Sequence, residues 1–379
     1  MATGGTIKIM QGNEACVEGA LAAGCRFYTG YPIEPASEIA EGMARQLPPA
    51  GGIFVQMEDE LASVIALVGA SWGGWKAMTA TSGPGFCLMQ DGIGLAAITE
   101  TPCVIVDVQR GGPASGQSTA PSQGDVFQAR YGANGDYSLI ALAPSTSQEM
   151  FEFTIKAFNL AERYRVPVIV LADEIVAHTR ERVYIPPADQ IAVVNRKQPA
   201  VPPAEFLTFK PDADGIPPMP AFNTGYKLCV ISQVHNEKGF RAKGKEGAAL
   251  IRRLTDKIEK NAGAICEVEE LYTEDATTIV VCYGSVARCA RRAVKDAREQ
   301  GWKAGLLKLN TLWPFPAKQV KAVAARAQRI LVPEMNIGRI ALEVERASGG
   351  ACEVIPLPKL DGKCHIPAEI LAAIKGGCR

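Results

Sequence analysis

Two short segments are almost entirely apolar, and they constrain the fold more than any other feature of the chain. They are PCVIVDVQ (residues 102–109) and VPVIVLADE (166–174). Parallel strands that helices cover on both faces carry such continuous apolar runs. Helix-like segments alternate with them, including NEACVEGALAAG (13–24), which ends on a glycine suited to a helix C-terminus. The pattern predicts an open α/β domain with a parallel sheet.

The second half of the chain has a different organisation. Nine of the 25 prolines fall within residues 186–220, which predicts an extended linker that wraps a neighbouring surface. Strand and helix patterns resume near Thr277 with TTIVVCYG, so we expect a second, smaller α/β unit there. The predicted parts are residues 1–185, a linker with a charged helix over 186–276, and residues 277–379.

Composition excludes several classes of protein. Lys+Arg and Asp+Glu both number 40, so nothing indicates a nucleic-acid or anionic-membrane partner. The chain contains no apolar run near the roughly 20 residues of a membrane span and no signal-peptide core, so we expect a cytoplasmic protein. None of the eleven cysteines forms a C-x-x-C pair or an iron–sulfur spacing. Any cluster that serves this protein is therefore expected in another chain.

Three acids, Glu58, Asp59 and Glu60, stand in front of an apolar helix pattern. Asp59 suits a helix cap, and Glu60 has apolar i+4 and i+7 neighbours, so its carboxylate is expected to lie along an apolar surface. A buried carboxylate is costly and has a raised pKa, which favours a specific partner or a catalytic role. A solvated first turn is the alternative, and periodicity alone slightly favours it. The same pattern predicts one core-facing set of side chains: Leu61, Val64, Ile65 and Val68.

One cofactor chemistry requires a carboxylate in such a place. Thiamine diphosphate is activated when N1′ of its aminopyrimidine shares a proton with a carboxylate in an apolar pocket, on a helix packed against the ring. The sequence TSGPG (81–85) follows a strand pattern at a helix start, where free N–H groups could bind an anion, although a tight turn explains it equally well. We take Ser82, Gly83, Pro84 and Gly85 as candidate cofactor-binding residues. The scattered histidines, His178, His235 and His365, predict no metal site.

Long stretches of the chain resemble the alpha subunit of 2-oxoacid:ferredoxin oxidoreductases, most closely the 2-oxoglutarate branch. The matching stretches are QGNEACVEGALAAG, GYPIEPASEIAE, QMEDELAS, TATSGPGFCLMQDGIG, VDVQRGGPASGQSTAPSQGDVFQARYG, TLWPFP and VPEMNIG. They occur in order and cover nearly the whole chain. The resemblance implies a pyrimidine-binding thiamine-diphosphate domain followed by a transketolase C-terminal-like α/β domain.

The resemblance also implies roles for individual residues. Glu60 matches the glutamate that binds N1′ of the cofactor, and Arg110 matches the arginine that holds the substrate carboxylate. A planar guanidinium suits this task because it binds a carboxylate through two hydrogen bonds. Without the resemblance, a salt bridge at a strand end would be the better interpretation of Arg110. Tyr31, Pro32 and Glu34, in YPIEP, are the other candidate substrate-binding residues.

The family divides its site between chains, so the resemblance implies partners. A beta subunit holds the diphosphate and Mg²⁺ on a motif that this chain lacks, and [4Fe-4S] clusters, a gamma subunit and a ferredoxin-like delta subunit or ferredoxin complete the system. The implied reaction converts a 2-oxoacid, coenzyme A and oxidised ferredoxin reversibly into acyl-CoA, CO₂ and reduced ferredoxin. The expected substrate is 2-oxoglutarate, and the chain is expected to be active only with its partners.

One departure from the family pattern concerns the substrate. The family usually has threonine where this chain has Glu34, and Gln117 and Ser118 are more polar than expected. A carboxylate 4 Å from the substrate would repel it by about 4 kcal/mol at moderate effective dielectric. Glu34 is then protonated, pairs with a cation such as Arg110, or indicates another 2-oxoacid (pyruvate, branched-chain, aryl or other).

The sequence leaves three alternative functions. A thiamine-dependent decarboxylase is disfavoured because the chain lacks the diphosphate motif. A nucleotide-binding dehydrogenase lacks its glycine fingerprint. A non-catalytic assembly subunit gains support from Glu34 but is opposed by the retained Glu60 and Arg110.

Overall fold

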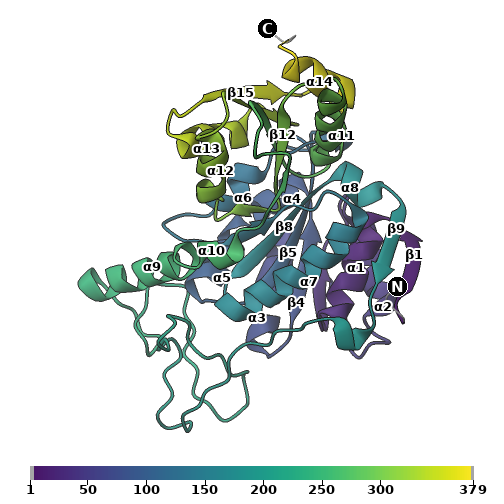
Figure 1. The fold of residues 1–379 in the computed structure, drawn as a ribbon. Helices are drawn as coiled ribbons and strands as arrows, with labels where there is room; N and C mark the ends of the chain where they lie inside the picture. The colour runs from purple at the N-terminus through teal and green to yellow at the C-terminus, as the bar shows by residue number, and fades with distance from the viewer. Residues whose placement is uncertain (1–3, 377–379) are drawn as a thin grey trace.

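A computed structural model describes residues 4–376, which form two α/β units joined by a long irregular segment (Figure 1). The strands of the first unit are β1 (Thr6–Met10), β2 (Phe27–Gly30), β3 (Ile53–Gln56), β4 (Ala77–Thr81), β5 (Cys103–Gly111), β6 (Gln117–Pro121), β7 (Ile140–Leu142), β8 (Pro167–Asp173) and β9 (Glu181–Ile185). Its helices are α1 (Gly12–Ala22), α2 (Ser37–Gln46), α3 (Glu60–Trp72), α4 (Gly83–Leu88), α5 (Gln90–Ile98), α6 (Val126–Tyr131), α7 (Ser147–Tyr164) and α8 (Glu174–His178).

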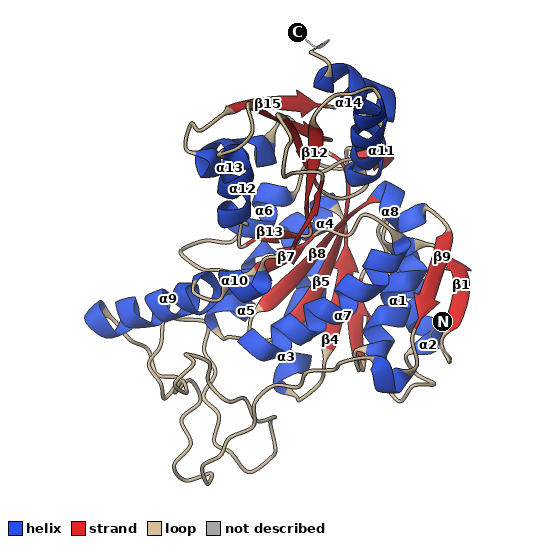
Figure 2. Ribbon diagram, viewed as in Figure 1, coloured by secondary structure: helices blue, strands red, loops and turns tan. Residues whose placement is uncertain are grey.

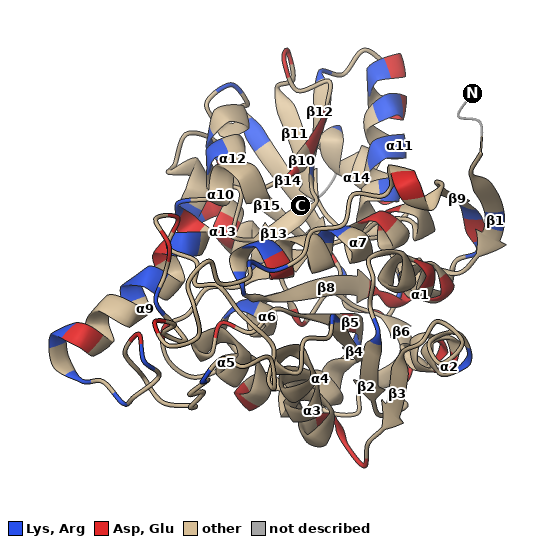
Figure 3. Ribbon diagram, turned by 90° about the horizontal axis from the view of Figure 1, so that it is seen from below, with Lys and Arg blue, Asp and Glu red and all other residues tan. Residues whose placement is uncertain are grey.

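The first unit is built on one large sheet with the strand order β13-β7-β8-β5-β4-β2-β3. All neighbours from β7 to β3 are parallel. The edge strand β13, which comes from the second unit, runs antiparallel, and so does β6, which pairs with β5 beside this path. Helices α1 and α7 lie on one side of this sheet and α3, α4 and α5 on the other (Figure 3). Every residue of β8 and the first eight of β5 are buried, which confirms the prediction of parallel strands covered on both faces.

The second unit has a five-stranded sheet in the order β10-β12-β11-β14-β15 (Figure 2). Its strands are β10 (Val268–Leu271), β11 (Thr278–Cys282), β12 (Ala304–Leu309), β14 (Arg329–Glu334) and β15 (Glu353–Pro358), and β13 (Thr311–Trp313) leaves it to join the first sheet. Its helices are α11 (Val286–Glu299), α12 (Ala317–Ala324), α13 (Arg339–Ser348) and α14 (Pro367–Ile374). Alternate side chains of β11 face opposite layers of the protein. Val280 packs with residues of α11 and α14, whereas Ile279 and Val281 belong to the apolar core that includes residues of α12, α13 and the first unit. The predicted class, two α/β units, is confirmed.

The segment between the units is mostly irregular. It contains the short helical turn η1 (Ala188–Gln190) and then no α-helix before α9 (Gly244–Glu259) and α10 (Ala262–Ile265). Hydrogen bonds hold it on the first unit: the buried Arg196 pairs with Glu162 at 2.7 Å, and the backbone N–H of Phe222 donates to the carbonyl of Trp72 at 2.9 Å. The segment therefore wraps the surface of its own first unit.

A buried ion cluster fastens α9 to the first unit. Glu100 is fully buried, and its carboxylate accepts hydrogen bonds from Arg253 at 2.6 Å and from Lys257 at 2.7 Å. Burial alone would raise the pKa of Glu100, but the charges of Lys257 and Arg253 outweigh burial and hold that pKa at about 2. The cluster is therefore a charged anchor between α9 and the loop after α5.

A helix that spans a membrane must be both long and apolar. Within residues 4–376, no helix combines the length and the apolar character needed to cross a bilayer.

Candidate functional site

The candidate residues gather at one edge of the first sheet. Tyr31 follows β2, Glu60 follows β3, Ser82 follows β4, and Arg110 lies at the end of β5. These strands are parallel neighbours in the order β5-β4-β2-β3, so their carboxyl ends lie side by side. Ligands of open α/β sheets bind outside this edge. The topology therefore brings together residues that are up to 79 positions apart, from Tyr31 to Arg110.

Glu60 is the first residue of α3 and is only 5% exposed. Asp59 is the N-cap, and its carboxylate accepts a hydrogen bond from the backbone N–H of Ala62 at 2.7 Å, as the sequence predicted. Burial raises the pKa of Glu60, the nearby Asp59 adds to the rise, and Arg110 opposes it. Burial therefore favours the protonated form of the Glu60 carboxyl.

The other prediction for α3 was partly wrong. Val64 and Val68 are buried, but Leu61 and Ile65 are 45% and 43% exposed. The helix is apolar around most of its circumference, so periodicity alone could not distinguish its buried face. This structure leaves Leu61 and Ile65 on an uncovered face of α3.

Gly85 lies against the carboxylate of Glu60. A Cβ at this position would lie 2.4 Å from Oε1 of Glu60 and 2.3 Å from Oγ1 of Thr81, closer than real Cβ atoms approach. Gly83 in the same turn has φ +40°, in the left-handed region that favours glycine. The TSGPG turn is thus shaped around Glu60, which the sequence did not indicate.

Arg110 is 8% exposed and is bound by backbone oxygens. Its Nη1 donates to the carbonyl oxygen of Glu34 at 2.5 Å, and its Nη2 donates to the carbonyl oxygen of Ser115 at 3.1 Å. Its Nε is buried without a hydrogen-bond partner among residues 4–376, and no carboxylate in that range forms an ion pair with it. A salt bridge at the strand end, the alternative reading, is therefore absent there. The guanidinium charge is available for an anionic ligand.

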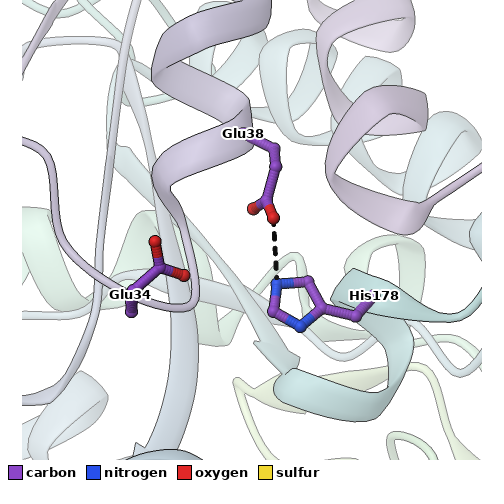
Figure 4. A group of neighbouring side chains, drawn as sticks. All are labelled: Glu34, Glu38 and His178. Atoms are coloured by element: carbon purple, nitrogen blue, oxygen red, sulfur yellow. Dashed lines mark ion pairs between the residues drawn. The ribbon is translucent and has the colours of Figure 1, made fainter.

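The carboxylate of Glu34 forms no ion pair with Arg110 among the described residues. This carboxylate lies in a group with Glu38 and His178, whose ligand atoms are all within 4.8 Å of one another (Figure 4). Tyr31 and Pro32, on the same loop, are exposed. Of the three explanations for Glu34, pairing with Arg110 is not observed, because only the backbone of Glu34 bonds to that residue.

A cavity of about 580 Å³ adjoins the site between the two units. From the first unit it is lined by Gly83, Pro84, Arg110 and Gln117 among others, but not by Glu60 or the 31–34 loop. The second unit contributes lining residues that sequence reasoning did not single out: Asn336, Arg339 and Lys359. The segment VPEMNIG, which contains Asn336, was the only signal that could have indicated them.

Two buried acids near this cavity were also missed. Asp107, in β5, is fully buried, and neither of its carboxylate oxygens has a hydrogen-bond partner among the described residues. Burial raises the pKa of Asp107 well above its usual value, and the neighbouring Asp125 raises it further. Burial also raises the pKa of Asp125 to about 6, although Arg339 and Arg110 oppose the rise. Two adjoining buried carboxyls retain a proton because both cannot ionise cheaply.

Several buried polar atoms at this edge lack a partner within residues 4–376. They are Oγ1 of Thr81, Oγ of Ser82, Nε of Arg110 and both carboxylate oxygens of Asp107. Buried polar groups are normally hydrogen-bonded, so this concentration indicates a missing polar ligand. An aminopyrimidine fits these residues, because it offers donors and acceptors to hydroxyls and a ring nitrogen to the carboxyl of Glu60.

Comparison with family descriptions agrees with this geometry. Residues 18–251 match the family described as "Pyruvate flavodoxin/ferredoxin oxidoreductase, thiamine diP-bdg". Residues 276–370 match the one described as "Pyruvate:ferredoxin oxidoreductase core domain II". The first match contains the candidate residues from Tyr31 to Arg110.

Relatives of known name extend over nearly the whole chain. The 2-oxoglutarate synthase subunit KorA of Methanothermobacter thermautotrophicus is 53% identical over 96% of this chain and 97% of its own length. The subunit of the same name from Methanocaldococcus jannaschii is 51% identical over 98% and 100%.

A solved structure is also similar. The 2-oxoglutarate:ferredoxin oxidoreductase from Magnetococcus marinus, with 2-oxoglutarate, coenzyme A and succinyl-CoA bound, has a TM-score of 0.92 and 32% identity. The match covers 98% of this chain and 65% of that chain, so this protein spans about two thirds of its length. The fold, the site and these matches agree, and the chain belongs to the thiamine-diphosphate-binding 2-oxoacid:ferredoxin oxidoreductase family.

Proposed function

We propose that this chain is the alpha subunit of a 2-oxoglutarate:ferredoxin oxidoreductase. The reaction converts 2-oxoglutarate, coenzyme A and oxidised ferredoxin reversibly into succinyl-CoA, CO₂ and reduced ferredoxin. The observation that carries the proposal is the buried carboxyl of Glu60 beside Gly85, within the segment that matches the thiamine-diphosphate-binding family. The names of relatives more than 50% identical support 2-oxoglutarate as the substrate.

Glu60 is the proposed catalytic residue. Its carboxyl would share a proton with N1′ of the aminopyrimidine, and the burial that raises its pKa favours the protonated carboxyl. Ser82, Gly83, Pro84 and Gly85 form the wall against which the ring packs, with Gly85 leaving room for the carboxyl. When bound, thiamine diphosphate supplies the nucleophilic carbon that attacks the 2-oxo group.

Arg110 is the proposed substrate-binding residue. Two backbone carbonyls orient its guanidinium, and three of its five N–H donors, including that of Nε, remain for a substrate carboxylate. Tyr31, Pro32 and Glu34 border the substrate site, and Glu34 acts through its backbone oxygen. Arg339 adds a further cation to the cavity lining, which suits a substrate with two carboxylates. Another 2-oxoacid, or a non-catalytic assembly role, are the alternatives.

Several parts of the proposal lie outside this chain. The proposed partners are a beta subunit that carries the diphosphate and Mg²⁺ site, a gamma subunit, and a ferredoxin-like delta subunit or ferredoxin with [4Fe-4S] clusters. The enzyme is placed in the cytoplasm. Within the chain, residues 1–185 are proposed as the pyrimidine-binding domain, 186–276 as the linker, and 277–379 as the transketolase C-terminal-like domain.

The test uses the native complex, purified without oxygen, in an assay of viologen dye reduction with coenzyme A and a panel of 2-oxoacids. Glu60→Gln is expected to lower turnover by about 100-fold or more, since it cannot exchange the proton, while subunit assembly is unchanged. Glu58→Gln, at an exposed acid two residues away, is the matched control and retains activity. Near-normal turnover of the Glu60 variant would refute the assignment of the cofactor carboxylate.

The substrate panel separates the remaining alternatives. Selective dye reduction with 2-oxoglutarate supports the proposed substrate. Preference for another acid keeps the family and changes the substrate. Absence of turnover with every acid, in a complex that contains thiamine diphosphate and its clusters, favours the assembly role.

A further inference from the structure

A second group of chemistry-bearing side chains lies behind the substrate loop, outside the 580 Å³ cavity. Glu34 and Glu38 come from the loop before α2 and from α2 itself, and His178 is the last residue of α8 (Figure 4). Each offers one ligand atom, and these atoms are all within 4.8 Å of one another. His178 is 140 positions beyond Glu38 in the sequence, so only the fold brings it beside the two glutamates.

The ring of His178 is held in the orientation that metal-binding histidines adopt. Its Nδ1 lies 3.2 Å from Oε1 of Glu174, and its Nε2 lies 3.4 Å from Oε1 of Glu38. An Nδ1–H donated to Glu174 leaves the Nε2 lone pair facing the two carboxylates, as in the carboxylate–histidine–metal arrangement. Nε2 is shielded from solvent, and its 3.4 Å contact with Oε1 of Glu38 is too long for a strong hydrogen bond.

A fully buried amide fixes the carboxylate of Glu38. Nδ2 of Asn13, which is 0% exposed, donates to Oε2 of Glu38 at 2.8 Å and to the carbonyl oxygen of Pro35 at 2.9 Å. Its Oδ1 has no partner within the described residues. Asn13 therefore holds Oε2 of Glu38, while Oε1 contacts His178.

The charges of the group are not balanced by the protein. Glu34, Glu38 and Glu174 surround one imidazole, and within residues 4–376 no Lys or Arg forms an ion pair with any of the three carboxylates. Such a concentration of negative charge attracts a cation. Two carboxylate oxygens and one imidazole nitrogen favour a borderline transition metal over Mg²⁺ or Ca²⁺, which take oxygen ligands.

We propose that Glu34, Glu38 and His178 bind a divalent transition-metal ion of the Zn²⁺ type, with Glu174 orienting the histidine. Glu34 is exposed, which leaves a coordination position for water. The ion joins the 31–35 loop and α2 to the end of α8. Because the carbonyl of Glu34 accepts the hydrogen bond from Arg110, the ion also fixes the loop that orients this arginine. The Glu34 carboxylate is thereby kept away from Arg110.

The competing occupant is a proton. The hydrogen bond that the ring donates to Glu174 raises the pKa of His178, with Glu38 adding to the rise, so an imidazolium would also reduce the negative charge. A protonated ring cannot bind a metal through Nε2, so the two occupants exclude each other. Direct measurement of bound metal distinguishes them.

The experiment measures metal binding by the native complex after treatment with a chelator. Equilibrium dialysis with ⁶⁵Zn²⁺ at pH 7.5 is expected to show one more tight site per alpha chain in the wild type than in Glu38→Gln or His178→Gln. Glu41→Gln, at an exposed acid on the same helix α2, is the matched control and keeps the site. Glu174→Gln is expected to weaken affinity about 10- to 100-fold, as removal of an orienting partner does.

Equal zinc binding by all of these proteins would overturn the proposal and leave the imidazolium as the occupant. Cysteine-bound zinc cancels in the comparison, because every variant has the same cysteines. If a His178 or Glu38 variant does not assemble, Glu34→Gln replaces it, since this side chain is exposed and its loss leaves the interior intact. Zinc stoichiometry unchanged in Glu34→Gln would then also count against the site.

Discussion

The guanidinium of Arg110 donates to the backbone carbonyl of Glu34, and the carboxylate of the same glutamate lies in a group with Glu38 and His178. An acid can therefore occupy this loop position without meeting the substrate. The electrostatic conflict that the sequence suggested is avoided by the direction of one side chain. The contact that remains is independent of the side chain at position 34.

Arg110→Lys is expected to lower kcat/KM for 2-oxoglutarate by about 100-fold, because a lysine cannot reproduce the paired donors of the planar guanidinium. The measurement is dye reduction by the native complex over a range of substrate concentrations.

Glu34→Thr is the matched control for Arg110→Lys, since it keeps the backbone carbonyl that Arg110 contacts. We expect a change in kcat/KM of less than about threefold, because the lost carboxylate lies in the group with Glu38 and His178. An effect as large as that of Arg110→Lys would place the Glu34 side chain in the substrate pocket.

Gly85→Ala is expected to reduce turnover by about 10-fold or more while the complex still assembles. The added methyl would lie 2.4 Å from Oε1 of Glu60, so the carboxyl must move from its place beside the ring. Gly263→Ala, in α10, is the control, because its Cβ meets no atom within 4 Å. Full activity of the Gly85 variant would show that the position of Glu60 tolerates displacement.

Asp125→Asn is expected to change the pH dependence of stability. The folded protein raises the pKa of Asp125 from its usual 3.8 to about 6, so the stability that this proton contributes is complete below about pH 4 and is lost as the pH rises through 6. Asparagine does not titrate. The melting temperature of the variant should therefore rise relative to that of the wild type between about pH 4 and 6.

The exposed Asp136 provides the control for this prediction. The difference in melting temperature between Asp136→Asn and the wild type should be constant over the same pH range. A constant difference for Asp125→Asn as well would show that its carboxyl is ionised throughout.

Glu100→Gln is expected to lower the free energy of unfolding by about 3–5 kcal/mol, because it leaves Arg253 and Lys257 buried without their counter-ion. Denaturant unfolding of the purified protein measures the loss. Since the pKa of Glu100 is held at about 2, its contribution is complete above about pH 4.5 and is lost as the pH falls toward 2.

Asp256→Asn removes an exposed ion pair with Lys260 on the same helix and is the control for Glu100→Gln. Its cost should not exceed about 0.5 kcal/mol. Similar losses from both variants would mean that the buried cluster contributes no more than a surface pair.

The sequence predicted the parts of the fold that depend on local pattern. The apolar runs of β5 and β8 identified buried parallel strands. The apolar neighbours of Glu60 raised the possibility of its burial, although periodicity alone slightly favoured a solvated first turn, and the structure shows it buried. Contacts between distant segments could not be predicted in this way. No local pattern places His178 beside Glu38, or Asp107 beside Asp125, because these contacts depend on how the elements pack.

Side-chain direction was the other limit. Sequence spacing placed Glu34 in the substrate loop but gave no information on which side of the loop its carboxylate would lie. The exposure of Leu61 and Ile65 was missed for a related reason, since an apolar helix offers more than one face that could be buried.

Strand β13 has a consequence for how the chain can be divided. It belongs by sequence to the second unit, yet Thr311 and Trp313 pair with β7 at the edge of the first sheet. A fragment that ends before β13 would leave the β7 edge uncovered, and exposed edges of this kind template aggregation. The two units therefore share a strand and are not joined by a linker alone. A protein engineer who separates them should keep β13 with the first unit.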